Sequence, residues 1–186
     1  MTRVLTTLLL LLSLLLPVAA CAAVAEIDSV TVEISNGVKS SFVVKNAFTP
    51  QIDEAIASGV PTSFTFRAEV NLSHGLFWFD ERFAAIEFRH TVKYDTLKQE
   101  YSVVREERGR EVVRTADNAE MKRLMSVVEP VSLLPTAPMK SGVKYDLRIK
   151  AELSEVKLPL SLDYLFFFVK LWDFETDWYY HSFTYR

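Results

Sequence analysis

The chain has one cysteine and five glycines among its 186 residues, and each scarcity argues against a class of site. A single cysteine can form neither an internal disulfide nor a multi-cysteine metal centre. Because the glycines are few and not clustered, a glycine-rich loop that cradles a nucleotide phosphate is not expected. The sequence also lacks a G-x-S-x-G nucleophile turn and an H-E-x-x-H zinc helix. We therefore expect a protein that is not an enzyme and that carries no metal or cofactor.

A strong charge of one sign is also missing. The chain has 21 basic and 24 acidic side chains, so nothing in its net charge of −3 favours binding to nucleic acid. Its residues are 49% hydrophobic and 12% aromatic, a composition typical of a folded globular protein.

The N-terminal residues predict export. Arg3 precedes an apolar run over residues 8–16, Pro17 interrupts it, and small residues follow up to Ala25. This is the layout of a secretory signal. The run is shorter than the ~20 apolar residues that a membrane-spanning helix needs. We therefore expect residues 1–20 to be a cleaved signal peptide and the mature chain to lack a transmembrane span.

Cys21 lies where a bacterial lipoprotein signal places its lipidated residue. It follows Val18-Ala19-Ala20, which fits a lipobox. Lipidation of Cys21 would anchor the protein to a membrane, facing the periplasm. The alternative is ordinary cleavage near residues 22–25, because the small residues there also have the A-x-A form. The sequence leaves a lipoprotein and a soluble periplasmic protein both open.

Alternation of apolar and polar residues predicts one β-rich domain over residues 27–186. Alternating segments predict half-buried strands, because side chains two residues apart share a face; these segments are residues 30–34, 64–72, 86–94 and 143–151. A further hairpin is predicted over residues 101–115, with its turn near Arg108-Gly109. We expect a mainly antiparallel, sandwich-like domain with two short helices.

The two helices are predicted from their ends. Thr49 can cap the first, and Gly59 follows it. Asp117 can cap the second, with Glu120 as a capping-box partner, and Pro130 is expected to stop it. Apolar residues of the second helix recur at helical spacing and predict a face that packs on a sheet: Met121, Leu124, Met125 and Val128.

The histidines give no sign of a metal or catalytic site. His90 falls on the apolar face of its predicted strand, so we expect a core histidine. His74 lies in a predicted loop and His181 among aromatic residues, and no pair has metal-ligand spacing.

The most distinctive segment is residues 172–178. Its acidic residues occupy every second position: Asp173, Glu175 and Asp177. Its large aromatic residues are Trp172, Phe174 and Trp178. In an extended chain the carboxylates share one face and the aromatic rings share the other. A solvated acidic face over buried rings is the simplest interpretation, and a calcium site or an acid–base pair are the alternatives.

An apolar run over residues 158–169 precedes this segment, and burial is the commoner outcome for such a run. If part of it is exposed, it forms a contact surface with the acidic segment for a partner protein or a lipid. The residues of this candidate interaction surface are Phe167, Trp172, Asp173, Glu175, Asp177 and Trp178.

Several segments, taken in order, resemble one known family: Thr65-Phe66-Arg67-Ala68-Glu69-Val70, Phe77-Trp78-Phe79-Asp80-Glu81, Tyr145-Asp146-Leu147-Arg148, Leu158-Pro159-Leu160 and residues 172–179. They resemble the bacterial exported family known as domain-of-unknown-function 4390. The resemblance implies an envelope location and a weak link to envelope signalling. It implies no established activity, so it supplies no catalytic residue.

Two functions therefore stay open. The first is a non-catalytic bacterial envelope protein that binds a partner protein or lipid through its aromatic C-terminal region. The second is a carboxylate-dependent envelope hydrolase that uses Asp80, Glu81 and the carboxylates of residues 173–177. The absence of nucleophile and phosphate motifs favours the first. Convergence of the carboxylates in one pocket would favour the second.

Overall fold

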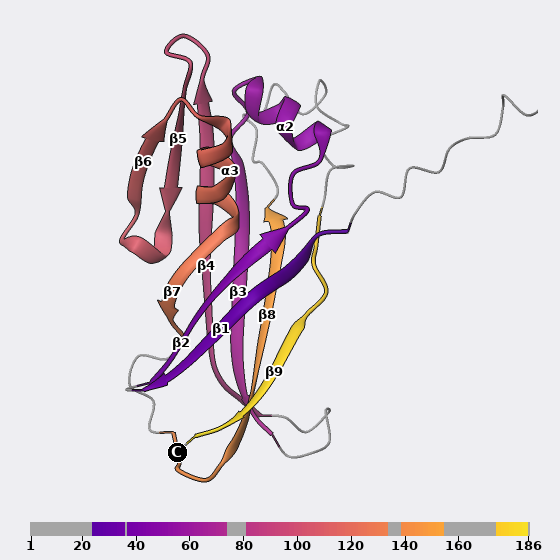
Figure 1. The fold of residues 1–186 in the computed structure, drawn as a ribbon, viewed down its shortest axis with the longest axis vertical. Helices are drawn as coiled ribbons and strands as arrows, with labels where there is room; N and C mark the ends of the chain where they lie inside the picture. Colours follow the sequence, from indigo (N-terminus) through magenta and orange to yellow (C-terminus); the bar gives the residue numbers. More distant parts are fainter. Residues whose placement is uncertain (1–23, 36, 74–80, 134–138, 155–173, 186) are drawn as a thin grey trace, which may run out of the picture.

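The computed structural model describes residues 24–35, 37–73, 81–133, 139–154 and 174–185, which form two antiparallel sheets and two α-helices (Figure 1). The larger sheet has the order β6 (Glu111–Thr115), β5 (Glu100–Arg105), β4 (Glu81–Asp95), β3 (Thr62–Leu72), β8 (Lys144–Ser154) and β9 (Tyr179–Thr184). The smaller sheet has the order β1 (Glu26–Ser35), β2 (Gly37–Lys45) and β7 (Val127–Ser132). The helices are α2 (Pro50–Ala57) and α3 (Asn118–Ser126). No helix in these ranges is both long and apolar enough to cross a membrane.

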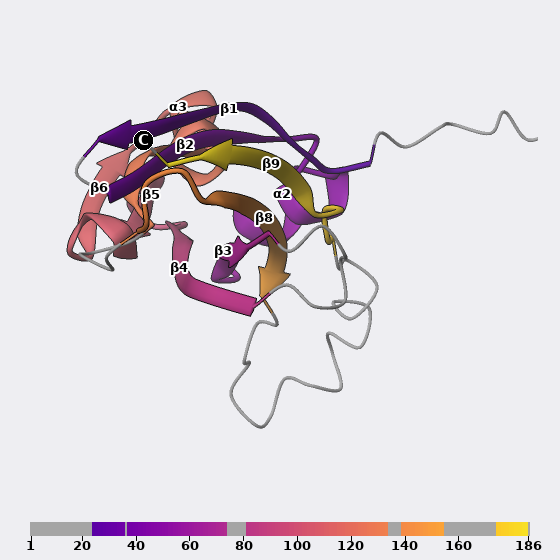
Figure 2. The ribbon, with the colours of Figure 1, turned by 90° about the horizontal axis from the view of Figure 1, so that it is seen from below.

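The smaller sheet and α3 lie on the same side of the larger sheet, which gives the fold its layers (Figure 2). One hydrophobic cluster fills the space between them and extends from Ala25 to Phe183. Phe42 of β2 meets Phe66 of β3 edge to face, with ring centroids 5.8 Å apart. The expected mainly antiparallel, sandwich-like architecture with two short helices is therefore confirmed.

The central strand β3 shows why the alternation pattern identified the strands. Its apolar positions from Phe64 to Val70 are buried on the core face, while Arg67 lies on the opposite face and stays partly exposed. β3 pairs with β4 on one side and β8 on the other, so that Phe66 lies level with Phe88 and Ala151. Because paired residues share a face, the apolar positions of all three strands line the same core.

Both helix starts are capped by the expected residues. The Thr49 hydroxyl accepts a hydrogen bond from the Ile52 N–H at 3.3 Å, and the Asp117 carboxylate accepts one from the Ala119 N–H at 2.9 Å. Glu120 does not close a capping box, which is a correction. Its carboxylate accepts the Thr115 hydroxyl hydrogen at 2.8 Å, and the Thr115 oxygen accepts the Asp117 N–H at 3.1 Å. Thr115 thus accepts the hydrogen bond from the N-cap N–H that Glu120 would accept in a capping box.

Pro130 does not stop α3, contrary to expectation, because the helix already ends at Ser126. Pro130 instead lies inside β7, an outer strand of the smaller sheet. The register between β7 and β2 shifts beside it, from Val128 opposite Phe42 to Val131 opposite Ser40. Proline has no N–H to give a ladder, so it is tolerated at an irregularity on an outer strand.

Candidate functional sites

Much of the candidate interaction surface lies outside the described residues. This holds for Phe167, Trp172 and Asp173, and also for Cys21 and Asp80. His74 and the side chain of Glu81 lie outside them as well. The described members are Glu175, Asp177 and Trp178.

Residues 174–177 lie along the end of β8 with alternating orientation. The Phe174 ring is buried and meets Phe64 edge to face, with centroids 4.9 Å apart. Thr176 is buried, and it donates its N–H to the Ala151 carbonyl at 2.9 Å and accepts the Ala151 N–H on its hydroxyl at 3.0 Å. Glu175 and Asp177 are exposed. The expected solvated acidic face is therefore what these residues form.

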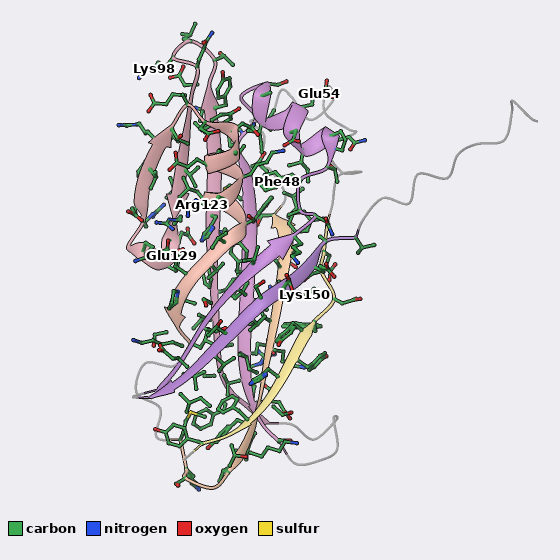
Figure 3. The ribbon with its side chains drawn as sticks, in the orientation of Figure 1. Phe48, Glu54, Lys98, Arg123, Glu129 and Lys150 are labelled. Carbon is green, nitrogen blue, oxygen red and sulfur yellow. The ribbon has the colours of Figure 1, made fainter. Side chains whose placement is uncertain are left out.

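Trp178 departs from the expected pattern, because it does not join Phe174 in the core. Its ring lies under two cations of β8, with the Arg148 guanidinium carbon 5.2 Å and the Lys150 nitrogen 5.5 Å from the ring centroid. Lys150 projects from β8 beside β9 and forms an ion pair with Glu175 (Figure 3). Tyr180, opposite Arg148 in the register, is 58% exposed. We call Arg148, Lys150, Glu175, Trp178 and Tyr180 the Trp178 surface.

A network of ion pairs on the outer face of the larger sheet holds the Arg148 guanidinium over Trp178. Glu69 of β3 has a side chain only 5% exposed, and its Oε2 accepts hydrogen bonds from Arg148 Nη2 at 2.6 Å and Nε at 3.1 Å. Arg82 of β4 approaches the other oxygen of Glu69 to 3.4 Å. The two-donor contact holds the Arg148 guanidinium in one orientation, so the Trp178 surface is preorganised.

A second constellation lies on the core side of the larger sheet, around His90 of β4. The expected core histidine is confirmed: its side chain is 0% exposed. His90 Nε2 lies 3.0 Å from Oε2 of Glu107, and Nδ1 lies 3.1 Å from the Met125 carbonyl oxygen at the end of α3. Glu107 belongs to a short 3-10 helix, η2 (Glu106–Arg108), in the turn between β5 and β6, and its side chain is 3% exposed.

Further charges surround this pair. Arg105 of β5, with a side chain 7% exposed, forms ion pairs with Glu111 of β6 and, at 3.6 Å, with Glu129 of β7. Arg108 of η2 also pairs with Glu129, which lies on β7 (Figure 3). We call His90, Arg105, Glu107, Arg108, Glu111 and Glu129 the His90 cluster. It ties the β5–β6 hairpin to β4 and β7, and through His90 to the end of α3.

The pKa of Glu107 reflects two opposing effects. Burial, the largest single effect, would raise the pKa of this carboxyl, but the hydrogen bond from His90, the charge of His90, the Glu107 backbone N–H and the charge of Arg105 together hold the pKa below its ordinary value. Glu107 is therefore ionised at neutral pH. A buried carboxylate of this kind depends on its partner, because removing the partner leaves an uncompensated charge.

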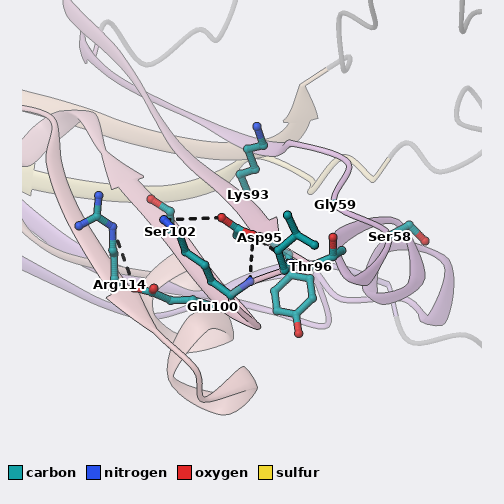
Figure 4. Close-up of a pocket in the computed structure, with 11 residues that line it drawn as sticks. Ser58, Gly59, Lys93, Asp95, Thr96, Glu100, Ser102 and Arg114 are labelled. Carbon is teal, nitrogen blue, oxygen red and sulfur yellow. Dashed lines mark hydrogen bonds and ion pairs between the residues drawn. The ribbon is translucent and has the colours of Figure 1, made fainter.

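A pocket of about 520 Å³ lies between the tip of the β4–β5 hairpin and the end of α2 (Figure 4). Ion-pair contacts within its lining are Arg114 with Glu100 at 4.0 Å and Lys98 with Asp95 at 3.9 Å. Neither Glu175 nor Asp177 lines it. Within the described ranges, no three His, Cys, Asp or Glu side chains gather closely enough to hold a metal ion.

These features define the class of the protein: a mainly antiparallel β protein in which a small sheet and two helices accompany a six-stranded sheet with a charged outer face. The chain belongs to the family described as a domain of unknown function (DUF4390), whose model matches residues 22–182. The family expected from the sequence is thus confirmed, and the matched range contains both the Trp178 surface and the His90 cluster. No curated protein and no solved structure matches the chain.

Proposed function

We propose that the protein is an exported, non-catalytic module of the bacterial cell envelope that binds a partner protein through the Trp178 surface. The observation that carries this proposal is the Trp178 ring, which lies outside the core against Arg148 and Lys150. Tryptophan, tyrosine and arginine are the residues that most often dominate binding energy at protein interfaces. A preorganised arginine beside an aromatic ring loses little conformational freedom on binding.

The charges of the surface favour a protein partner over an anionic lipid. Glu175 is 60% exposed beside Lys150, and Asp177 is exposed as well. Carboxylates at the rim repel a negatively charged membrane, whereas a mixed rim around an aromatic centre is typical of protein interfaces. The position next to β9, an outermost strand of the larger sheet, leaves this side of the sheet without a further strand among the described residues.

Trp178→Ala is expected to weaken binding of the partner about thirtyfold, the effect of losing a ~2 kcal/mol hot-spot residue. Site-specific photo-crosslinking from position 180 in the native envelope identifies the partner, and titration of the purified pair then gives the dissociation constants. The matched control is Val112→Ala, which truncates an exposed apolar side chain at the opposite edge of the same sheet. Equal affinity of the two variants would contradict the proposed surface. Loss of vesicle binding in Trp178→Ala, with no protein crosslink, would show that the Trp178 surface binds a lipid and not a partner protein.

We also propose that export proceeds through the signal of residues 1–20 and that Cys21 becomes the lipidated N-terminus. The lipobox-like residues before Cys21 and its position after an apolar run support this. Intact mass spectrometry of the protein purified from its native membrane is expected to show a chain that begins at Cys21 and carries acyl groups. Cys21→Ser should abolish this mass and the membrane attachment. A mature chain that begins at Ala23 or Glu26 without lipid would contradict lipidation but not export.

A further inference from the structure

The two hydrogen bonds of the His90 ring depend on how many of its two nitrogens carry a hydrogen. One ring nitrogen faces the carboxylate of Glu107 and the other faces the carbonyl oxygen of Met125. A carbonyl oxygen and an ionised carboxylate can only accept hydrogen bonds, and a neutral imidazole has only one N–H. With Glu107 ionised, both bonds are therefore made only when both ring nitrogens carry hydrogen, which is the imidazolium form. The ring is fully buried, so solvent does not replace a missing bond.

The charges that face His90 lead to the same protonation state. β5 contributes Arg105, η2 contributes Glu107 and Arg108, and the carboxylates of Glu111 and Glu129 come from β6 and β7. β3 places the uncharged Phe66 ring beside His90, with the two ring centroids 4.7 Å apart. With an imidazolium the cluster contains three cations and three carboxylates; with a neutral ring it contains one carboxylate in excess.

The end of α3 adds to this preference. Met125 lies in the last turn of the helix, whose carbonyl groups point beyond its C-terminus. A cation is stabilised at a helix C-terminus by the helix dipole. Imidazolium at His90 therefore satisfies Glu107, the Met125 carbonyl and the dipole at once.

We infer that the His90–Glu107 pair is a pH-sensitive latch that fastens the β5–β6 hairpin to β4 and to the end of α3. The latch is closed by an imidazolium and a carboxylate, and it is released when a rise in pH removes one ring proton. After that loss, one of the two acceptors has no donor. For Glu107 the loss is severe, because no donor among the described residues reaches its other oxygen. The turn at η2 must then open for the carboxylate to reach water.

A fall in pH also opens the latch, because it protonates Glu107. Because the pKa of Glu107 is lowered in the folded protein, its contribution to stability is complete above the ordinary pKa of a glutamate. That contribution is lost as the pH falls through the lowered value. The latch is therefore closed at intermediate pH and opens in acid and in base. If the protein is exported as proposed, such a latch would respond to the pH outside the cytoplasm. This consequence rests on the proposed location.

Glu107→Gln separates the latch from a merely structural contact. The glutamine amide can donate to His90 Nε2 while Nδ1–H donates to the Met125 carbonyl, so a neutral ring keeps both bonds. In the wild-type chain, imidazole nitrogen NMR is expected to show both ring nitrogens protonated at pH 6. Amide protection factors in β5 and β6 should fall by up to about tenfold per pH unit as the ring proton is lost, because one proton is bound more tightly in the closed state. In Glu107→Gln the ring should be neutral and the hairpin protection independent of pH.

The control is His181→Asn, which removes a histidine of β9 whose ring stacks on Phe183, outside the His90 cluster. This variant should keep the wild-type pH dependence of the hairpin. A wild-type ring with one bare nitrogen at pH 6, while the hairpin is protected, would overturn the inference. A pH dependence of Glu107→Gln equal to that of the wild type would overturn it as well. Both outcomes are independent of whether Trp178 binds a partner.

Discussion

Replacing Phe66 with alanine is expected to lower the free energy of unfolding by about 3–5 kcal/mol, measured by urea denaturation. The Phe66 side chain is fully buried on β3, at the centre of the larger sheet. Its ring contacts Phe42 from the smaller sheet and stacks on Phe88 of β4, with centroids 5.3 Å apart in the second contact. Truncation therefore leaves a cavity between the two sheets, which neighbouring side chains fill only in part.

The matched control is Arg67→Ala, at the next position on the same strand. Arg67 points to the outer face, where it pairs with Glu87 at 3.0 Å and Glu152 at 3.7 Å in partly exposed contacts. Ion pairs of this kind contribute at most about 1 kcal/mol, so this variant should lose little stability. Similar losses for the two variants would show that the faces of β3 are assigned incorrectly.

The strands could be predicted from the sequence because each long strand has one face on the core. Period-two alternation follows directly from that environment, as Phe64 to Val70 show. The order of strands could not be predicted in the same way. β3 pairs with β8 across a connection that places Arg148 against Glu69, 79 residues away in the chain. The expectation that Pro130 ends a helix was wrong, because its residue type does not reveal that it lies at a register shift on an outer strand.

The departure of Trp178 from the core also has a physical cause, a single extra residue. Tyr179 lies opposite Ile149 on β8, whereas Glu175 lies opposite Glu152. Three steps along β8 thus correspond to four steps along the C-terminal segment. The extra residue shifts the alternation, so Thr176 and Tyr179 face inward while Trp178 faces the cations of the outer side. Regular alternation from the sequence could not predict this irregularity.

The His90 cluster shows the same limit for the candidate sites. The sequence placed His90 in the core, because its strand alternates. It gave no sign of Glu107, a turn residue that is buried only because the end of α3 and the β5–β6 turn meet over His90. The one available signal was Arg105, a charge at an inward position after Tyr101 and Val103. A charged residue in an apolar pattern indicates a buried partner.

Phe174→Ala is expected to destabilise the protein nearly as much as Phe66→Ala, by about 3–5 kcal/mol. Phe174 is buried against Phe64, and its carbonyl accepts the Leu153 N–H at 2.9 Å. These contacts fix the C-terminal segment to β8 and so place Trp178 under its cations. Loss of the ring removes the anchor while leaving the charged residues of the Trp178 surface intact.

Glu175→Ala is the control for this prediction, because it truncates the next residue, whose side chain is exposed and forms an ion pair with Lys150. It should change the free energy of unfolding by less than about 1 kcal/mol. Urea denaturation of the two variants distinguishes a ring that anchors the segment from an exposed residue at its rim. A nearly unchanged midpoint in Phe174→Ala would show that the segment is not fixed to the core through this ring. The Trp178 surface would then lose its preorganisation, and Arg148 alone, held by Glu69, would be the fixed contact that a partner meets.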